Sequence, residues 1–139
     1  MGLVYADIEL VNSDDVALLN AGIKKPEEVR REVVNMLVDS GAYMLCVNDK
    51  LRTQLGLKTI LRQSAQLANG DITEVDIVGP VEVNFLNRST SCRAMVLPGD
   101  NEPLLGSIPM EDLDVIIDPR DRILKLPPDR PYMAQKSLK

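Results

Sequence analysis

The chain has 139 residues, the size of one domain, and 45% of them are apolar, which is enough to bury a core. Its net charge of −5, with no contiguous run of basic residues, argues against nucleic acid or an anionic membrane as the main partner. Histidine is absent, so a Ser-His-Asp triad, a Cys-His pair and most zinc sites are excluded.

The N-terminal sequence has no basic segment followed by a long apolar one, and no apolar run approaches the roughly 20 residues of a membrane span. The two cysteines, Cys46 and Cys92, are too few for a disulfide framework. We expect them to be buried or half-buried thiols in a reducing compartment. The sequence therefore predicts a cytoplasmic protein.

The first third of the chain predicts a strand, a short helix and an ambiguous segment. Residues 3–11 alternate between apolar and polar side chains, as in a strand. Ser13 can cap a short helix that Gly22 ends in a left-handed conformation. Residues 26–38 begin with proline and two acids, as a helix does, but their valines and leucines also suit a buried strand.

Hairpins dominate the rest of the chain. Asn69-Gly70 is the strongest hairpin turn signal in the sequence, and Gly79-Pro80 is expected to separate the first hairpin from the second. The sequence predicts a strand over 42–47 and helices over 48–56 and 108–113. It also predicts three hairpins: 59–67 with 72–78, 80–86 with 91–98 across a turn at 87–90, and 115–126 with its turn at 118–121. This predicts an all-β domain over residues 1–126 with two or three short helices, followed by a Pro-rich tail over 127–139.

The stretch LVDSGA, residues 37–42, places a carboxylate between two apolar segments. Asp-Ser-Gly alone suits an ordinary turn or a helix cap, and this interpretation of Asp39 stays open. An acid in such surroundings, however, needs hydrogen-bond donors or a shared proton. The small residues Gly41 and Ala42 would allow a ligand backbone to approach closely.

A second segment follows 65 residues later, where Leu104-Leu105-Gly106 leads into a short helix. The order of LVDSGA, the Asn69-Gly70 hairpin, a second hairpin and the Leu-Leu-Gly segment resembles the retropepsin family of aspartic proteases over residues 3–126. It is most similar to single-domain bacterial retropepsin-like proteins. The resemblance implies an acid-protease, barrel-like fold in which Val29–Val38 is extended.

The resemblance also implies roles for the residues of the loop. Asp39 would be the catalytic aspartate, and the hydroxyl of Ser40 would brace the two Asp loops across a dimer. Gly41 would let the loop turn, and Ala42 would contact the substrate backbone. Residues 43–44 are Tyr and Met, whereas viral enzymes carry further acids at these positions. The hydrogen bonds between the Asp39 loop and the substrate therefore stay unassigned.

Two further parts of the implied site lie elsewhere in the chain. Ala68, Asn69, Gly70 and Asp71 occupy the place of the flap that closes over the substrate. Gly106 would pack behind the Asp loop in a structural role. The hairpin tip is more polar and less glycine-rich than a viral flap, so its contacts are open.

The implied function is hydrolysis of peptide bonds by two carboxylates, one taking a proton from water and the other giving one to the substrate. The chain contains one Asp-Ser-Gly, so a homodimer with two Asp39 side chains on its axis is required. Peptides or proteins would be the substrates, with no metal, no organic cofactor, no nucleic acid and no membrane involved. Two alternatives stay open: a catalytically silent module of this fold that dimerises or binds peptides, and a structural β-domain that assembles through its sheet edges.

Overall fold

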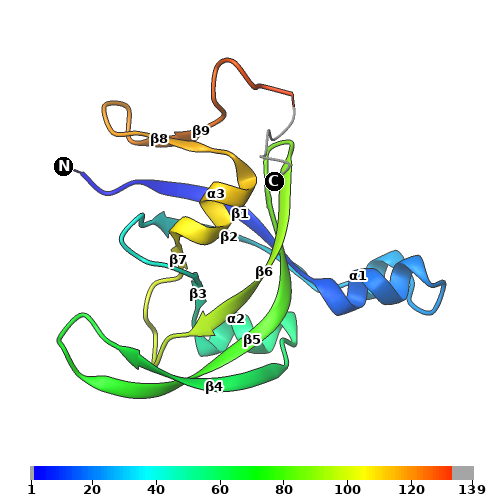
Figure 1. Ribbon diagram of the computed structural model, residues 1–139. Helices are drawn as coiled ribbons and strands as arrows, with labels where there is room; N and C mark the ends of the chain where they lie inside the picture. Colours follow the sequence, from blue (N-terminus) through cyan, green and yellow to red (C-terminus); the bar gives the residue numbers. More distant parts are fainter. Residues whose placement is uncertain (1, 133–139) are drawn as a thin grey trace, which may run out of the picture.

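The computed structural model describes residues 2–132, and within them the chain is mostly β with three short helices, as predicted (Figure 1). The strands are β1 (Tyr5–Asn12), β2 (Arg31–Val38), β3 (Leu45–Val47), β4 (Thr59–Gln66), β5 (Ile72–Phe85), β6 (Arg88–Val96), β7 (Leu104–Leu105), β8 (Ile116–Asp118) and β9 (Ile123–Lys125). The helices are α1 (Ser13–Asn20), α2 (Asp49–Leu55) and α3 (Ser107–Leu113), with a 3-10 turn at Pro26–Glu28. None of the helices in the described part of the chain has the length and apolar character needed to cross a bilayer.

Seven strands form one sheet in the order β1-β2-β7-β3-β6-β5-β4. A second pairing, of β1 with β5, closes this sheet into a barrel and leaves β4 outside it. Strand β7 is parallel to β2 and antiparallel to β3, so it lies between the strands on either side of the LVDSGA loop. Strands β8 and β9 form a separate two-stranded sheet.

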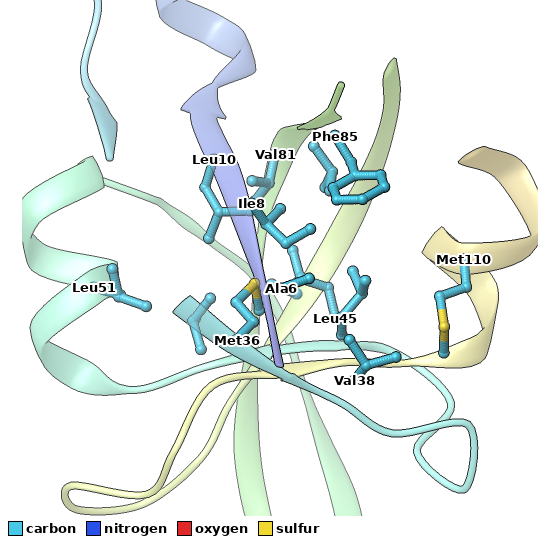
Figure 2. Close-up of a cluster of buried hydrophobic side chains, with 14 of the residues drawn as sticks. Ala6, Ile8, Leu10, Met36, Val38, Leu45, Leu51, Val81, Phe85 and Met110 are labelled. Carbon is cyan, nitrogen blue, oxygen red and sulfur yellow. The ribbon is translucent and has the colours of Figure 1, made fainter. Parts of the chain in front are cut away.

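The barrel encloses an aliphatic core (Figure 2). Ile8 and Leu10 of β1 and Met36 of β2 are fully buried, because alternate residues of each strand face the interior. Leu51 of α2 covers part of the same core, and Phe85 is its single buried aromatic residue. Burying each such side chain contributes roughly 1.5–3 kcal/mol, so the barrel is stabilised mainly by aliphatic packing.

The ambiguous segment 26–38 is resolved as a short 3-10 turn followed by strand β2. The strand pairs with β1 from Val11↔Arg31 to Tyr5↔Leu37, so its extended conformation is fixed by seven cross-strand partners. The prediction of an extended Val29–Val38 is therefore confirmed over residues 31–38. Pairing and burial of one face outweigh the local preference for a helix.

The cap of α1 differs from the prediction. Asn12, not Ser13, is the N-cap, and its Oδ1 accepts a hydrogen bond from the backbone N–H of Asp15 at 3.0 Å. Its amide group also donates to the carbonyl of Leu55 at 2.9 Å, which a serine hydroxyl at the next position is not placed to do. The predicted end of the helix is confirmed, since Gly22 has a φ of +76°.

The second hairpin also differs from the prediction. Strand β5 runs without a break through Gly79-Pro80, because a register shift between Val78 and Val81 accommodates these two residues. Its turn with β6 lies at residues 86–87 and not at 87–90, since Phe85 already pairs with Arg88. One long strand therefore serves both hairpins.

The described part of the predicted tail lies against this turn. The side-chain amide of Asn87 donates to the carbonyls of Pro131 and Tyr132 at 2.9 and 3.2 Å. Arg130 binds Asp114 through two hydrogen bonds of 2.8 and 3.0 Å. Residues 127–132 are therefore held by the body of the same chain, and residues 133–139 of the tail lie outside the described residues.

Candidate active site

Asp39 is the first residue after β2, and its backbone is held by the neighbouring strand β7. Val38 pairs with Leu105, and the N–H of Asp39 donates to the carbonyl of Leu105 at 3.0 Å. The loop then turns on itself: Asp39 Oδ1 accepts from the N–H of Gly41 at 2.9 Å, and its carbonyl accepts from Ala42 at 3.1 Å. The carboxylate is half-buried and its orientation is set by its own loop.

Gly106 lies directly beneath this loop. A Cβ at Gly106 would stand 2.3 Å from the carbonyl oxygen of Met44 and 2.9 Å from that of Ala42, so only glycine fits. The first two amides of α3 donate to the carbonyls of Ala42 and Tyr43 at 2.8 and 3.0 Å. Because these carbonyls are bonded to α3, the predicted strand over 42–47 begins only at Leu45.

A cavity of about 780 Å³ opens beside Asp39. Its walls come from three parts of the chain: the loop after β2 together with Cys46 of β3, the strand β4 with the hairpin tip, and the segment from the end of β6 to β7. In Figure 1 the tip of the β4–β5 hairpin and the loop after β2 lie on the same side of the molecule, while α1 projects from the other side. Segments that are far apart in the sequence thus lie around one carboxylate.

The structure divides the residues singled out from the sequence into two groups. Five of them line the cavity: Asp39, Gly41, Ala42, Ala68 and Asn69. The other four do not: Ser40 is exposed beside Asp39, Gly70 and Asp71 lie at the exposed hairpin tip, and Gly106 is buried beneath the loop. The loop and one flank of the hairpin tip are therefore brought together across the cavity.

The hairpin tip is a three-residue loop closed by a hydrogen bond from the N–H of Leu67 to the carbonyl of Asp71 at 2.8 Å. Gly70 takes the left-handed conformation, with a φ of +91°. The Oδ1 of Asn69 accepts from the N–H of Asp71 at 2.9 Å and fixes the turn. The predicted position of the turn is confirmed, although the loop has one residue more than a two-residue Asn-Gly turn.

The other residues that line the cavity were not identified from the sequence as site residues: Tyr43, Met44, Cys46, Gln63, Ser64, Ala65, Gln66, Leu67, Met95, Leu97, Pro98, Asn101 and Leu104. A signal for some of them exists, since residues 63–70 form an uncharged run between Arg62 and Asp71. A mostly exposed uncharged run of this length stands out in a chain in which 27% of all residues are charged. The residues from 95 to 104 carry no comparable signal, because only the sheet topology brings them to the site.

Asp39 is the one carboxylic acid among the described residues that line the cavity, and no Lys or Arg lines it. Burial raises the pKa of the neighbouring Cys46 thiol to about 11, and the negative charge of Asp39 adds to this effect. Cys46 is therefore protonated at neutral pH and is a poor nucleophile. Among residues 2–132, no group of three or more His, Cys, Asp or Glu could hold a metal ion. Asp39 is therefore the candidate acid–base group at this cavity.

Comparisons with known proteins identify the family and the fold of the chain. The family model described as gag-polyprotein putative aspartyl protease matches residues 28–110. EIAV protease, solved in complex with the inhibitor HBY-793, is similar with a TM-score of 0.54 and 15% identity over 81% of this chain and 88% of that one. The retroviral protease-like domain of Ddi1 from Leishmania major is similar with a TM-score of 0.56 and 15% identity over 92% of this chain and 90% of that one. Comparison with curated protein sequences finds no match. The fold is retropepsin-like.

Proposed function

Because the chain belongs to the family of gag-polyprotein putative aspartyl proteases, we propose that it is an aspartic endopeptidase acting on peptides or proteins. The observation that carries this proposal is the position of Asp39. It stands on a loop fixed by β7 and α3, at a cavity in which it is the one carboxylic acid among the described residues. The uncharged run 63–69, which includes the second half of β4, forms one wall of the cavity and suits an extended peptide.

The reaction requires a second carboxylate. One group must remove a proton from the attacking water while another protonates the substrate carbonyl or the leaving amine. Two carboxylates a few ångströms apart share one proton and can divide these tasks. Since the described residues of one chain supply a single carboxylic acid, Asp39, to the cavity, we propose a C2 homodimer that places two Asp39 side chains on its axis.

The neighbouring residues have supporting roles in this proposal. Ser40 is exposed next to Asp39, so its hydroxyl can bond to the loop of the second copy. Gly41 donates its N–H to the carboxylate and keeps the loop compact. Ala42 and the hairpin tip at residues 68–71 would hold the substrate backbone from its two sides. The metal-free chemistry requires no cofactor.

The test is cleavage of a peptide library by the purified chain, followed by mass spectrometry between pH 4 and 7. The wild type is expected to cleave with a bell-shaped pH profile on the acidic side of neutral, because one carboxylate must be protonated and the other ionised. Asp39→Asn should lower kcat/KM by roughly a hundredfold or more. Asp121→Asn, an exposed residue of the β8–β9 turn, is the control and should cleave normally.

The outcomes separate the proposed enzyme from the alternative. Retention of cleavage by a folded Asp39→Asn variant would refute the assignment of Asp39. If the folded wild type cleaves nothing at any pH yet still binds peptides or forms dimers, the chain is a catalytically silent binding or dimerisation module. A crystal structure of the dimer with facing Asp39 oxygens about 3 Å apart would support a shared proton.

A further inference from the structure

The β4–β5 hairpin extends beyond the barrel as a two-stranded ribbon. In the described pairings, β6 pairs with β5 from Phe85 back to Ile77, which is opposite Met95. From Ile72 to Asp76, β5 pairs with β4 alone. Most of β4 is exposed, and a two-stranded ribbon of this kind is marginally stable without further support. Since residues 63–69 line the cavity, the position of this ribbon determines the shape of the cavity.

Arg52 of helix α2 joins the ribbon to the barrel at the point where the third strand ends. Its Nη1 lies 2.8 Å from Oδ2 of Asp76, the residue that precedes Ile77 in β5. Its Nη2 donates to the hydroxyl of Thr59, the first residue of β4. One guanidinium group therefore contacts both strands of the hairpin at their base. The two charged side chains are only 28% and 24% exposed.

The other end of α2 contacts another part of the cavity wall. The side-chain amide of Asn48, the N-cap, donates to the carbonyl of Asn101 at 3.1 Å, and Asn101 lines the cavity. Leu51 and Leu55 of the same helix are buried in the core. The helix is thus anchored in the barrel and touches the cavity wall through Asn48 and through the ribbon that Arg52 holds.

We propose that α2 is a brace for the cavity, and that Arg52 is a positioning residue that holds the β4–β5 ribbon over Asp39 for substrate binding. The proposal rests on the proposed function for the identity of the ligand, a peptide. Arg52 touches neither the cavity nor Asp39, so its effect is exerted through Asp76 and Thr59. A partly exposed ion pair adds little to the global stability of the chain. At the base of a marginally stable ribbon, however, it shifts the equilibrium between a ribbon that lies over the cavity and one that is displaced from it.

The chain offers a matched control. Arg62 of β4 also contacts Asp76, at 3.5 Å, and Glu74 of β5, at 4.0 Å. These pairs lie within the hairpin and do not connect it to the barrel. Removal of Arg62 therefore takes a positive charge away from the same carboxylate but leaves the brace in place.

The experiment compares Arg52→Met and Arg62→Met by hydrogen–deuterium exchange of the intact chain. Arg52→Met should increase exchange in residues 59–76 by roughly threefold to fivefold, with no change in β1, β2 or β3. KM for a cleaved peptide should rise by a similar factor with kcat nearly constant. Arg62→Met should change the exchange of residues 59–76 and the KM less than Arg52→Met does. The charge-swapped double variant, Arg52→Asp with Asp76→Arg, should restore slow hydrogen–deuterium exchange in the ribbon.

Three results would overturn the proposal: unchanged exchange in the ribbon of Arg52→Met, faster exchange spread evenly over the whole chain, or an equal effect of Arg62→Met. The exchange measurement does not require activity. If the wild type cleaves no peptide, the endopeptidase proposal fails while exchange still decides on the brace. Peptide binding to Asp39→Asn, with and without Arg52→Met, then replaces KM as the second readout.

Discussion

Gly106 is buried against the backbone of the loop that carries Asp39, and this contact is the tightest constraint on the candidate site. The nearest atoms to an added Cβ are backbone atoms of residues 42–44, the closest at 2.3 Å, so no side-chain rotation can relieve the clash. Since φ at Gly106 is −87°, glycine is required here for space and not for conformation.

Gly106→Ala is therefore expected to lower the free energy of unfolding by about 1–3 kcal/mol, as overpacking does, and to displace the Asp39 loop. Urea denaturation measures the first effect, and amide chemical shifts of residues 39–44 measure the second. Gly22→Ala is the control: an added Cβ there meets nothing within 4 Å, so only the cost of its left-handed conformation remains. Loop shifts equal to those of the control would contradict this account.

Single residues were predictable where a local rule applies. Asp39 stood out because a carboxylate follows an apolar strand, and the left-handed glycines at 22, 56 and 70 follow from turn and cap geometry. Asn12 and Ser13 are both residue types that cap helices, and what favours Asn12 is its second hydrogen bond, to Leu55, which is 43 positions away. No local pattern of residues encodes such a contact.

At the scale of elements, one buried carboxylate in helix α1 ties the two ends of the segment 13–30 together, next to the start of β2. Asp15 is 1% exposed, and both of its oxygens are bonded to Arg30, with distances of 2.9 and 3.0 Å. Lys24 binds the same carboxylate at 2.6 Å. The bond from the Arg30 guanidinium, with a further contribution from Lys24, holds the pKa of Asp15 well below its ordinary value of 3.8. Helix α1 is thus held by charge more than by apolar packing.

The stability of the chain should consequently depend on Asp15 in acid. Because its pKa is lower in the folded state, the unfolded chain binds the proton more readily, so the contribution is complete above about pH 4 and is lost as pH falls further. At pH 7, Asp15→Asn should cost about 2 kcal/mol, and the difference from wild type should shrink below pH 4. Urea unfolding at several pH values measures this. Asp14→Asn, exposed on the same helix, should change stability much less; equal losses would contradict the assignment.

Whole elements were predicted well where side chains alternate, and less well where one strand takes part in two pairings. Most strands and all three helices lie close to their predicted positions because alternation and caps are local signals. The continuity of β5 through Gly79-Pro80 was missed because both residues are signals for a break. Its pairings with β1, β4 and β6 hold the strand together across this point.

At the scale of the molecule, the barrel positions its site through contacts between distant segments. Strand β7 has only two residues, yet it lies between β2 and β3 and so fixes both ends of the Asp39 loop. The cavity walls at 63–69 and 95–104 are brought together by this topology. Sequence order and the resemblance to retropepsins gave the loop and the hairpin tip, but the remaining wall depends on strand order, which propensities do not determine.

The molecule as described contains one carboxylic acid at its cavity, so activity should depend on two chains and not on one. This can be tested by mixing wild type with Asp39→Asn at constant total concentration, with time for subunits to exchange. If each active unit needs two intact Asp39 residues, activity follows the square of the wild-type fraction, because mixed dimers have one carboxylate and no partner for the shared proton. Mixing wild type with Asp121→Asn should leave activity unchanged at every ratio. A linear dependence on the wild-type fraction would mean that each chain acts alone, and the second catalytic group would then have to be sought within the same chain.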